Sequence, residues 1–197
     1  MDFATLVQKA RSCRRFVEAA PLPQGTLASL VDCARIAPSA ANAQPLRYML
    51  CEGGAVCSRV FPLIRWAAYL KDWNGPAEGE RPTGYIIMLG PAEGGSRVQC
   101  DLGIAAQTIQ LAATAADLGC CMIGAFDKPA LCAMFPMPEG LAPLLLIAVG
   151  QPAEERVLDL PGPDDDIRYW RDARGIHHVP KRSLETVVVA RFGDHNV

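Results

Sequence analysis

The segment over residues 98–118 constrains what this chain can fold into more than any other part of the sequence. It is apolar nearly all round and rich in alanine, which is typical of a buried helix packed closely against its neighbours. Gly119 follows it directly, as expected at a helix C-terminus. Half of the 197 residues are hydrophobic, which is enough apolar material for a sizeable core. We therefore expect one domain over residues 1–197 that buries this helix.

The rest of the chain alternates short helical and strand patterns. Apolar spacing predicts helices over residues 3–10, 26–37, 56–70 and 129–134, with Pro62 bending or breaking the third. Apolar or β-branched runs predict strands over residues 47–51, 84–89, 120–124, 144–149 and 184–190, and residues 151–175 are expected to be irregular. The glycine fingerprint of a dinucleotide fold and the Walker A loop are both absent. An ordinary Rossmann or P-loop fold is therefore disfavoured.

Charge and composition exclude several classes of partner. The net charge is −2, whereas a protein that binds a nucleic-acid backbone usually has an excess of basic residues. No apolar run is long enough to span a bilayer and no signal peptide is visible, so we expect a cytoplasmic protein with no membrane or nucleic-acid partner. The eight cysteines have no Cys-x-x-Cys spacing, and the adjacent His177 and His178 lack further ligands at metal-binding spacing. We therefore expect no metal.

Two basic clusters occur in this slightly acidic chain. Arg11, Arg14 and Arg15 lie close together near the N-terminus, and Lys181 and Arg182 lie near the other end. Arginine guanidinium groups match phosphate oxygens in a bidentate way. One interpretation is a phosphate site built from both ends of the chain. The alternative is a solvated helix end for the first cluster and a solvated segment before a strand for the second.

A polar loop over residues 38–45 joins a predicted helix to a predicted strand. In an extended backbone, which Pro45 favours at Gln44, the side chains of Asn42 and Gln44 point the same way. Their amides offer donors and acceptors that suit the edge of a planar heterocycle such as a flavin. The alternative is an ordinary polar loop. The Gly-flanked segment 118–126 either lets a backbone N–H approach a ligand closely or is simply a tight helix-to-strand connection.

Together these four segments, in this order and spacing, resemble the nitroreductase family of FMN-dependent oxidoreductases over essentially the whole chain. Residues 10–16 look like the family's Arg-Ser-x-Arg segment, residues 38–45 like its Pro-Ser-x-x-Asn-x-Gln-Pro loop, residues 107–125 like its central helix and the turn facing flavin N5, and residues 181–182 like its C-terminal basic pair. The resemblance implies an α+β fold with a mostly antiparallel central sheet packed by helices. It also implies an intertwined homodimer with C-terminal strand exchange, in which residues 176–197 cross to the partner subunit.

The same resemblance implies which residues bind FMN. The amides of the loop would hold the ring edge, and the basic residues would hold the phosphate. The full set is Arg11, Ser12, Arg14, Arg15, Pro38, Ser39, Ala40, Asn42, Gln44, Met122, Ile123, Gly124, Lys181 and Arg182. Ala10 stands where many members have an arginine, which leaves Lys9 and Arg15 as alternatives at the phosphate. Gly124 stands where some have glutamate, so only its backbone N–H would face N5. Positive charge near ring N1 and O2 is assigned to Arg11 or Arg14.

Residues 61–82 are where we expect a lid on the substrate side of the flavin. The segment concentrates aromatic surface before a loop rich in glycine and proline, and its lid residues are Trp66, Tyr69, Lys71 and Trp73. The alternative is that these aromatic side chains pack into the core.

The activity that the resemblance implies is oxidation and reduction of small molecules. Hydride would pass from NADH or NADPH through flavin N5 to a small oxidised acceptor, such as a nitroaromatic or a quinone, by a ping-pong mechanism. No catalytic side chain is expected, because the flavin carries the chemistry. Three alternatives stay open: a flavin-destroying or reductive-dehalogenating member of the same fold, a non-catalytic flavin- or nucleotide-binding regulatory protein, and a thiol redox sensor based on Cys120 and Cys121.

Overall fold

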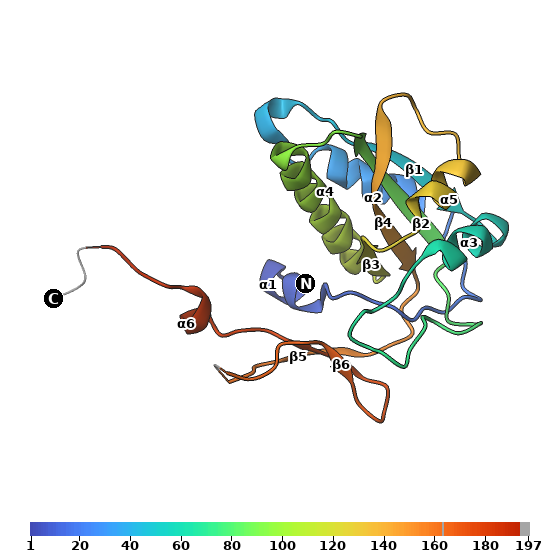
Figure 1. Cartoon of the computed structure of the whole chain (residues 1–197). Helices are drawn as coiled ribbons and strands as arrows, with labels where there is room; N and C mark the ends of the chain where they lie inside the picture. The colour runs from blue at the N-terminus through green and yellow to red at the C-terminus, as the bar shows by residue number, and fades with distance from the viewer. Residues whose placement is uncertain (163, 194–197) are drawn as a thin grey trace. The chain divides into compact units, whose positions relative to one another are not determined.

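The computed structural model describes residues 1–162 and 164–193 and groups the chain into two compact units, Met1–Glu154 and Glu155–Val197 (Figure 1). The single domain expected over residues 1–197 stays a prediction beside this division. The physical reason for the two units is the distribution of buried apolar side chains. Both hydrophobic core clusters of the described residues are formed within the N-terminal unit.

The N-terminal unit is built on a four-stranded sheet with the strand order β1-β2-β4-β3. Its strands are β1 (Arg47–Glu52), β2 (Gly84–Pro91), β3 (Gly119–Ile123) and β4 (Leu141–Gly150). Every neighbouring pair is antiparallel, and β2 and β4 are the central strands. Their continuous apolar runs suit strands that are covered on both faces. The predicted α+β fold with a mostly antiparallel sheet is confirmed.

Helices cover both faces of this sheet. Successive side chains of a strand point to opposite faces, so Ile86 and Met88 of β2 pack with α2 (Thr26–Arg35) and α4 (Ser96–Ala115) in one core cluster. Tyr85, Ile87 and Leu89 point the other way and pack with residues of α3 (Gly54–Val60) and α5 (Lys128–Met134). The sheet is therefore the middle layer of three.

The long helix α4 is buried on one side only. Leu102 and Ile109 lie in the core, whereas Cys100, Gly103 and Gln107 form an exposed stripe. The expectation that this helix is buried all round is wrong for the single chain, because small residues make its sequence look uniformly apolar although they occupy the outer face as well. Within the described ranges, no helix is both long and apolar enough to cross a membrane.

The predicted helix over residues 56–70 is only partly correct. The helix α3 ends at Val60, and Phe61–Leu63 form a 3-10 turn, η2, with Pro62 inside it. Proline lacks the N–H that an α-helix needs, and its ring clashes with the preceding turn. The chain therefore leaves the helix at Ile64, which has extended dihedral angles, and continues as irregular structure through the aromatic residues that follow.

The C-terminal unit contains a small three-stranded sheet and one short helix. Its elements are β5 (Arg156–Asp159), β6 (Trp170–Arg171), β7 (His177–Pro180) and α6 (Leu184–Val187), with the strand order β5-β7-β6. Two predictions are corrected here: the segment expected to be irregular contains β5 and β6, and the strand expected over residues 184–190 begins as α6. Ser183 caps this helix by accepting the N–H of Thr186 at 3.3 Å. The β-branched residues there favour a strand only when a neighbouring strand pairs with them.

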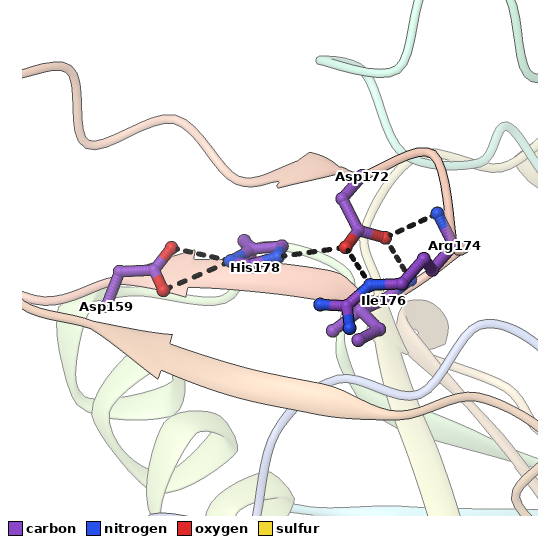
Figure 2. A network of polar contacts seen from close by, with 5 residues as sticks. All are labelled: Asp159, Asp172, Arg174, Ile176 and His178. Atoms are coloured by element: carbon purple, nitrogen blue, oxygen red, sulfur yellow. Dashed lines mark hydrogen bonds and ion pairs between the residues drawn. The ribbon is translucent and has the colours of Figure 1, made fainter.

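A polar network holds this small sheet together (Figure 2). The Nδ1 atom of His178 lies 3.1 and 3.0 Å from the two carboxylate oxygens of Asp159. Its Nε2 atom lies 3.8 Å from Asp172, which accepts the backbone N–H of Ile176 at 2.8 Å. The ring of Trp170 stacks on the imidazole with 4.0 Å between centroids. His178 therefore connects β5, β6 and β7 in place of an apolar core. No group of three metal-binding side chains is assembled among the described residues.

Candidate functional site

The N-terminal basic segment runs alongside β3. After α1 (Phe3–Lys9), Ser12 forms a parallel bridge with Cys120, and the N–H of Cys13 donates to the carbonyl of Cys120 at 2.8 Å. The fully buried side chains of Cys13 and Phe16 anchor the segment to the core. A close approach at Gly119 permits this packing, since a Cβ there would lie 2.7 Å from Cys13 Sγ. The structure therefore brings together two of the predicted site segments.

The three arginines of this segment have different surroundings. Arg11 donates from Nη2 to the carbonyl of Val7 at 2.6 Å, and its buried Nε has no hydrogen-bond partner among the described residues. Burial lowers the pKa of Arg11 from its ordinary value. The backbone N–H of Arg14 donates to a carboxylate oxygen of Glu154. Arg15 forms an ion pair with an acidic residue, so its charge is already matched inside the chain.

The predicted ring-binding loop has an unusual backbone. Residues 40–42 form the 3-10 turn η1 (Ala40–Asn42), and positive φ angles of 51°, 53° and 46° occur at Ala41, Asn42 and Gln44. The extended conformation expected at Gln44 before Pro45 is therefore wrong. The left-handed region is disfavoured for residues other than glycine, and such strain occurs most often at functional sites. The exposed amide of Gln44 donates to Asn42 Oδ1 at 3.1 Å, so the two predicted amides do lie together.

One residue that holds this loop was missed in the sequence. Asp101 of α4, only 4% exposed, accepts the hydroxyl of Ser39 at 2.6 Å and the N–H of Ala40 at 2.9 Å. Ser39 Oγ accepts in turn the N–H of Gln44 at 2.9 Å. The hydrogen bonds from Ser39 and Ala40 hold the pKa of Asp101 below its usual value. The sequence feature that could have identified Asp101 is an acidic residue within an apolar, alanine-rich helix.

A cavity of about 270 Å³ opens beside the loop. It lies between α2, α4 and β1, and Ser39, Gln44 and Asp101 contribute to its wall. Arg47 also lines it and donates from Nη1 to the carbonyl of Gln44 at 2.9 Å. Burial raises the pKa of Tyr48, which lines the same cavity. The loop therefore borders a concave surface with a polar rim.

The predicted segment over residues 118–126 contains β3 and the turn that follows it. Met122 is half-buried, Ile123 is buried, and the exposed Gly124 has open space where a Cβ would be. The N–H of Arg65 donates to the carbonyl of Ala125 at 2.9 Å, which ties the turn to residues 61–82. No described atom lies within 4 Å of the place that a Cβ would take at Gly124, so the space beside its backbone is open.

The two adjacent cysteines of β3 are both buried. Successive strand residues point to opposite faces, and Cys120 and Cys121 lie in different core clusters. Burial raises the pKa of Cys121, which disfavours the reactive thiolate. A thiol redox sensor based on this pair is therefore disfavoured.

The residues predicted to form a lid divide into two groups. Trp66 is 8% exposed, packs edge-on against Trp73 with 6.5 Å between centroids, and lies against Gly75. Trp66 therefore packs into the core, and the half-buried Trp73 packs against that core. Tyr69 and Lys71 are exposed. Whether these exposed residues cover a flavin stays a prediction.

The phosphate segment and the ring loop lie at different ends of α4. Asp101 fastens the loop near the start of the helix, while the basic segment is bonded to β3, directly after the helix ends at Ala115. At a rise of about 1.5 Å per residue, Asp101 and Ala115 are about 20 Å apart. Figure 1 shows α1 beside the C-terminal end of α4. Lys181 and Arg182 are exposed and follow β7 in the C-terminal unit.

Comparisons with known proteins agree with one another. The model of the Nitroreductase family matches residues 7–151. YdgI of Bacillus subtilis (strain 168), whose name describes a candidate NAD(P)H nitroreductase, is 22% identical over 204 residues, covering 86% of this chain and 98% of that protein.

Solved structures give the same result for the fold. A nitroreductase family protein from Clostridium novyi NT is similar with a TM-score of 0.62 at 25% identity, over 77% of this chain and 87% of that one. An FMN-dependent nitroreductase from Clostridium difficile R20291 is similar with a TM-score of 0.60 at 19% identity, over 76% of this chain and 90% of that one.

Proposed function

This chain belongs to the nitroreductase family, and on that premise we propose that it is an FMN-dependent oxidoreductase. It passes hydride from NADH or NADPH to a small oxidised acceptor, such as a nitroaromatic or a quinone, in a ping-pong reaction. The observation that carries the proposal is the strained loop held by Asp101, which presents Asn42 and Gln44 at the surface in the family's Pro-Ser-x-x-Asn-x-Gln-Pro sequence.

The residues at the phosphate end suit the phosphate of FMN. The buried Nε of Arg11 has no partner among the described residues, and a phosphate oxygen would provide one. A nearby anion would also offset the burial that lowers the pKa of Arg11. We assign Arg11 and Arg14 to this role, with the exposed Lys181 and Arg182 as the second basic pair.

The residues at the ring end suit a flat heterocycle. The exposed amides of Asn42 and Gln44 would bind the edge of the ring, and the absence of a side chain at Gly124 lets the backbone approach the reacting atom. When bound, FMN supplies the two-electron chemistry at N5. The chain's own residues bind the flavin, orient it and place positive charge of Arg11 or Arg14 near N1 and O2, which stabilises the reduced form.

We further propose that the working unit is a homodimer in which each site is shared. In one chain the two halves lie beside opposite ends of α4, near Asp101 and near Ala115, and these two helix positions are about 20 Å apart. We infer that the ring and the phosphate of one FMN do not reach both halves of the same chain. The exposed stripe of α4 at Cys100, Gly103 and Gln107 includes two small residues, Cys100 and Gly103, which allow close packing against a second copy. Exposed apolar residues of the C-terminal segment, among them Leu184 and Val187, suit the crossing of residues 176–197 to that copy.

Uptake of FMN and reduction by nicotinamide test the proposed activity. The purified protein should be yellow or take up FMN, and anaerobic titration with NADH and with NADPH, each alone, should bleach the flavin with at least one of them. A protein that takes up no FMN contradicts the proposal. Uptake without bleaching by either reductant supports the non-catalytic alternative. A panel of nitroaromatic, quinone and halogenated acceptors separates the related activities.

Complementation tests the shared site. One variant carries Arg11→Gln and Arg14→Gln, and the other carries Asn42→Ala and Gln44→Ala. If the halves come from different subunits, a purified heterodimer of the two variants has one intact site and binds about half of the wild-type amount of FMN. Sites formed within single chains would leave none intact, so a heterodimer without FMN would contradict the arrangement, as would a monomeric protein.

A further inference from the structure

The loop that presents Asn42 and Gln44 has a strained backbone. Three residues other than glycine have positive φ angles, at Ala41, Asn42 and Gln44. Within the loop, the N–H of Asn42 donates to the carbonyl of Ser39 at 2.9 Å, and Gln44 Nε2 donates to the carbonyl and to Oδ1 of Asn42. A strained backbone of this kind persists only when the surrounding structure holds it. The contacts that reach the loop from outside therefore add to its own hydrogen bonds in holding this conformation.

Asp101 supplies such contacts at both ends of the loop. Oδ1 accepts the N–H of Ala40 at 2.9 Å, at the start of the strained stretch. Oδ2 accepts the hydroxyl of Ser39 at 2.6 Å, and Ser39 Oγ then accepts the N–H of Gln44 at 2.9 Å, at the end of the stretch. One carboxylate thus holds both sides of the strained stretch, Ala40 directly and Gln44 through the Ser39 hydroxyl.

The carboxylate is itself rigidly placed. Asp101 is 4% exposed and belongs to α4, whose next residue, Leu102, is part of the core. Within the described ranges no cation forms an ion pair with Asp101. Among the described residues, the hydrogen bonds from Ser39 and Ala40 stabilise its negative charge, and a buried charge with few partners binds each of them strongly.

We propose that Asp101 is a positioning residue for the flavin, acting through Ser39 and Ala40 to hold Asn42 and Gln44 in their binding conformation. This inference rests on the proposed function. Asp101 faces the loop and contacts the flavin only through it. Its removal should therefore weaken FMN binding and shift the absorption bands of the bound ring, because both depend on where the loop amides lie.

The test compares three full-length variants with the wild type. Asp101→Ala removes both acceptors, whereas Asp101→Asn keeps one oxygen for Ala40 and leaves the Ser39 hydroxyl hydrogen without its acceptor. Leu102→Ala is the control, because it removes a buried core side chain of the same helix turn and none of the loop's hydrogen bonds. Titration by FMN fluorescence gives Kd, the thermal midpoint of the apo protein gives stability, and amide hydrogen exchange of the apo protein reports on Ala40 and Gln44.

We expect Asp101→Ala to raise the Kd for FMN roughly 10-fold or more and to abolish protection of the Ala40 and Gln44 amides. Asp101→Asn should have an intermediate Kd and keep protection at Ala40. Leu102→Ala should lower the thermal midpoint with a Kd within about twofold of the wild type. Equal increases in Kd for Asp101→Ala and Leu102→Ala would overturn the inference, as would rapid exchange of both amides in the wild type. A wild type that binds no FMN contradicts the proposed function, while the exchange measurement still decides whether Asp101 holds the loop.

Discussion

Arg15 Nε lies 3.2 Å from Glu80 Oε2, so one of the three N-terminal arginines is paired with the end of the 61–82 segment. The backbone strengthens this connection, because the N–H of Phe16 donates to the carbonyl of Glu80 at 2.9 Å. Glu18 completes it by accepting the N–H of Gly79 at 2.6 Å. The basic segment and the aromatic segment are therefore one structural unit, and the arginines within it have separable roles.

Replacing Arg14 should weaken FMN binding more than replacing Arg15. A phosphate bound by Arg14 would lose a charged hydrogen bond in Arg14→Gln, which we expect to raise the Kd roughly 10-fold or more. Arg15→Gln loses a half-exposed ion pair with Glu80 instead and should change the Kd by less than about threefold. Fluorescence titration of both variants measures the difference. A larger increase in Kd for Arg15→Gln would indicate that Arg15, and not Arg14, binds the phosphate.

Adding a methyl group at Gly119 should destabilise the protein. The new Cβ would lie 2.7 Å from Cys13 Sγ and 2.8 Å from Cys13 Cβ, so the basic segment must move. We expect Gly119→Ala to lower the free energy of unfolding by about 1–3 kcal/mol and to weaken FMN binding with it. Gly54→Ala is the control, because a Cβ at this exposed first residue of α3 meets nothing within 4 Å, and it should change the free energy of unfolding by less than about 0.5 kcal/mol. Urea denaturation measures the free energy of unfolding of both variants. Equal changes in the two variants would contradict the argument.

The aromatic segment should separate into residues that stabilise the fold and residues that affect acceptors. Trp66→Ala removes a side chain that is 8% exposed and should cost about 3–5 kcal/mol of unfolding free energy. Tyr69→Ala, at a side chain 56% exposed, should stay within about 0.5 kcal/mol of the wild type.

The half-buried Trp73 is the variant that tests the lid. Trp73→Ala should change the preference among quinones and nitroaromatics more than it changes the Kd for FMN. Steady-state kinetics with each acceptor measure that preference. Unchanged relative kcat/KM values across the panel would contradict the prediction that Trp73 belongs to a lid.

Acid should loosen the loop through Asp101. The hydrogen bonds from Ser39 and Ala40 lower the pKa of this carboxyl from 3.8, so the folded protein takes up its proton at lower pH than the unfolded chain. The stabilisation is therefore complete above the unfolded value and is lost as the pH falls through the folded one. The gap in unfolding free energy between the wild type and Asp101→Asn should narrow from about pH 5.5 to about pH 3. Urea denaturation at both pH values measures it, and a constant gap would show that the carboxylate form contributes nothing specific.

The sequence predicts well where local pattern and final environment agree. The apolar runs of β2 and β4 and the long apolar segment of α4 appear close to their predicted positions, because uninterrupted apolar residues require burial in any compact arrangement. The predictions fail where local propensity competes with context. The break expected at Pro62 occurs, but the helix expected after it does not form, and the β-branched residues after Ser183 begin as α6. Gln44 departs from the extended backbone that Pro45 favours, because Ser39 binds its N–H.

By itself, the sequence determined most elements of the N-terminal unit and the four segments that carry the family resemblance, and that resemblance implied the antiparallel α+β class. These depend on the order and spacing of residue types, which a chain carries before it folds. Only the tertiary structure decided how the segments are held. The partnership of Asp101 with Ser39 joins positions 62 residues apart, and the pairing of Arg15 with Glu80 depends on two loops meeting. The separation of the site along α4 follows from the rigid length of a packed helix. Such contacts arise from packing in space, and no local pattern encodes which distant groups will meet.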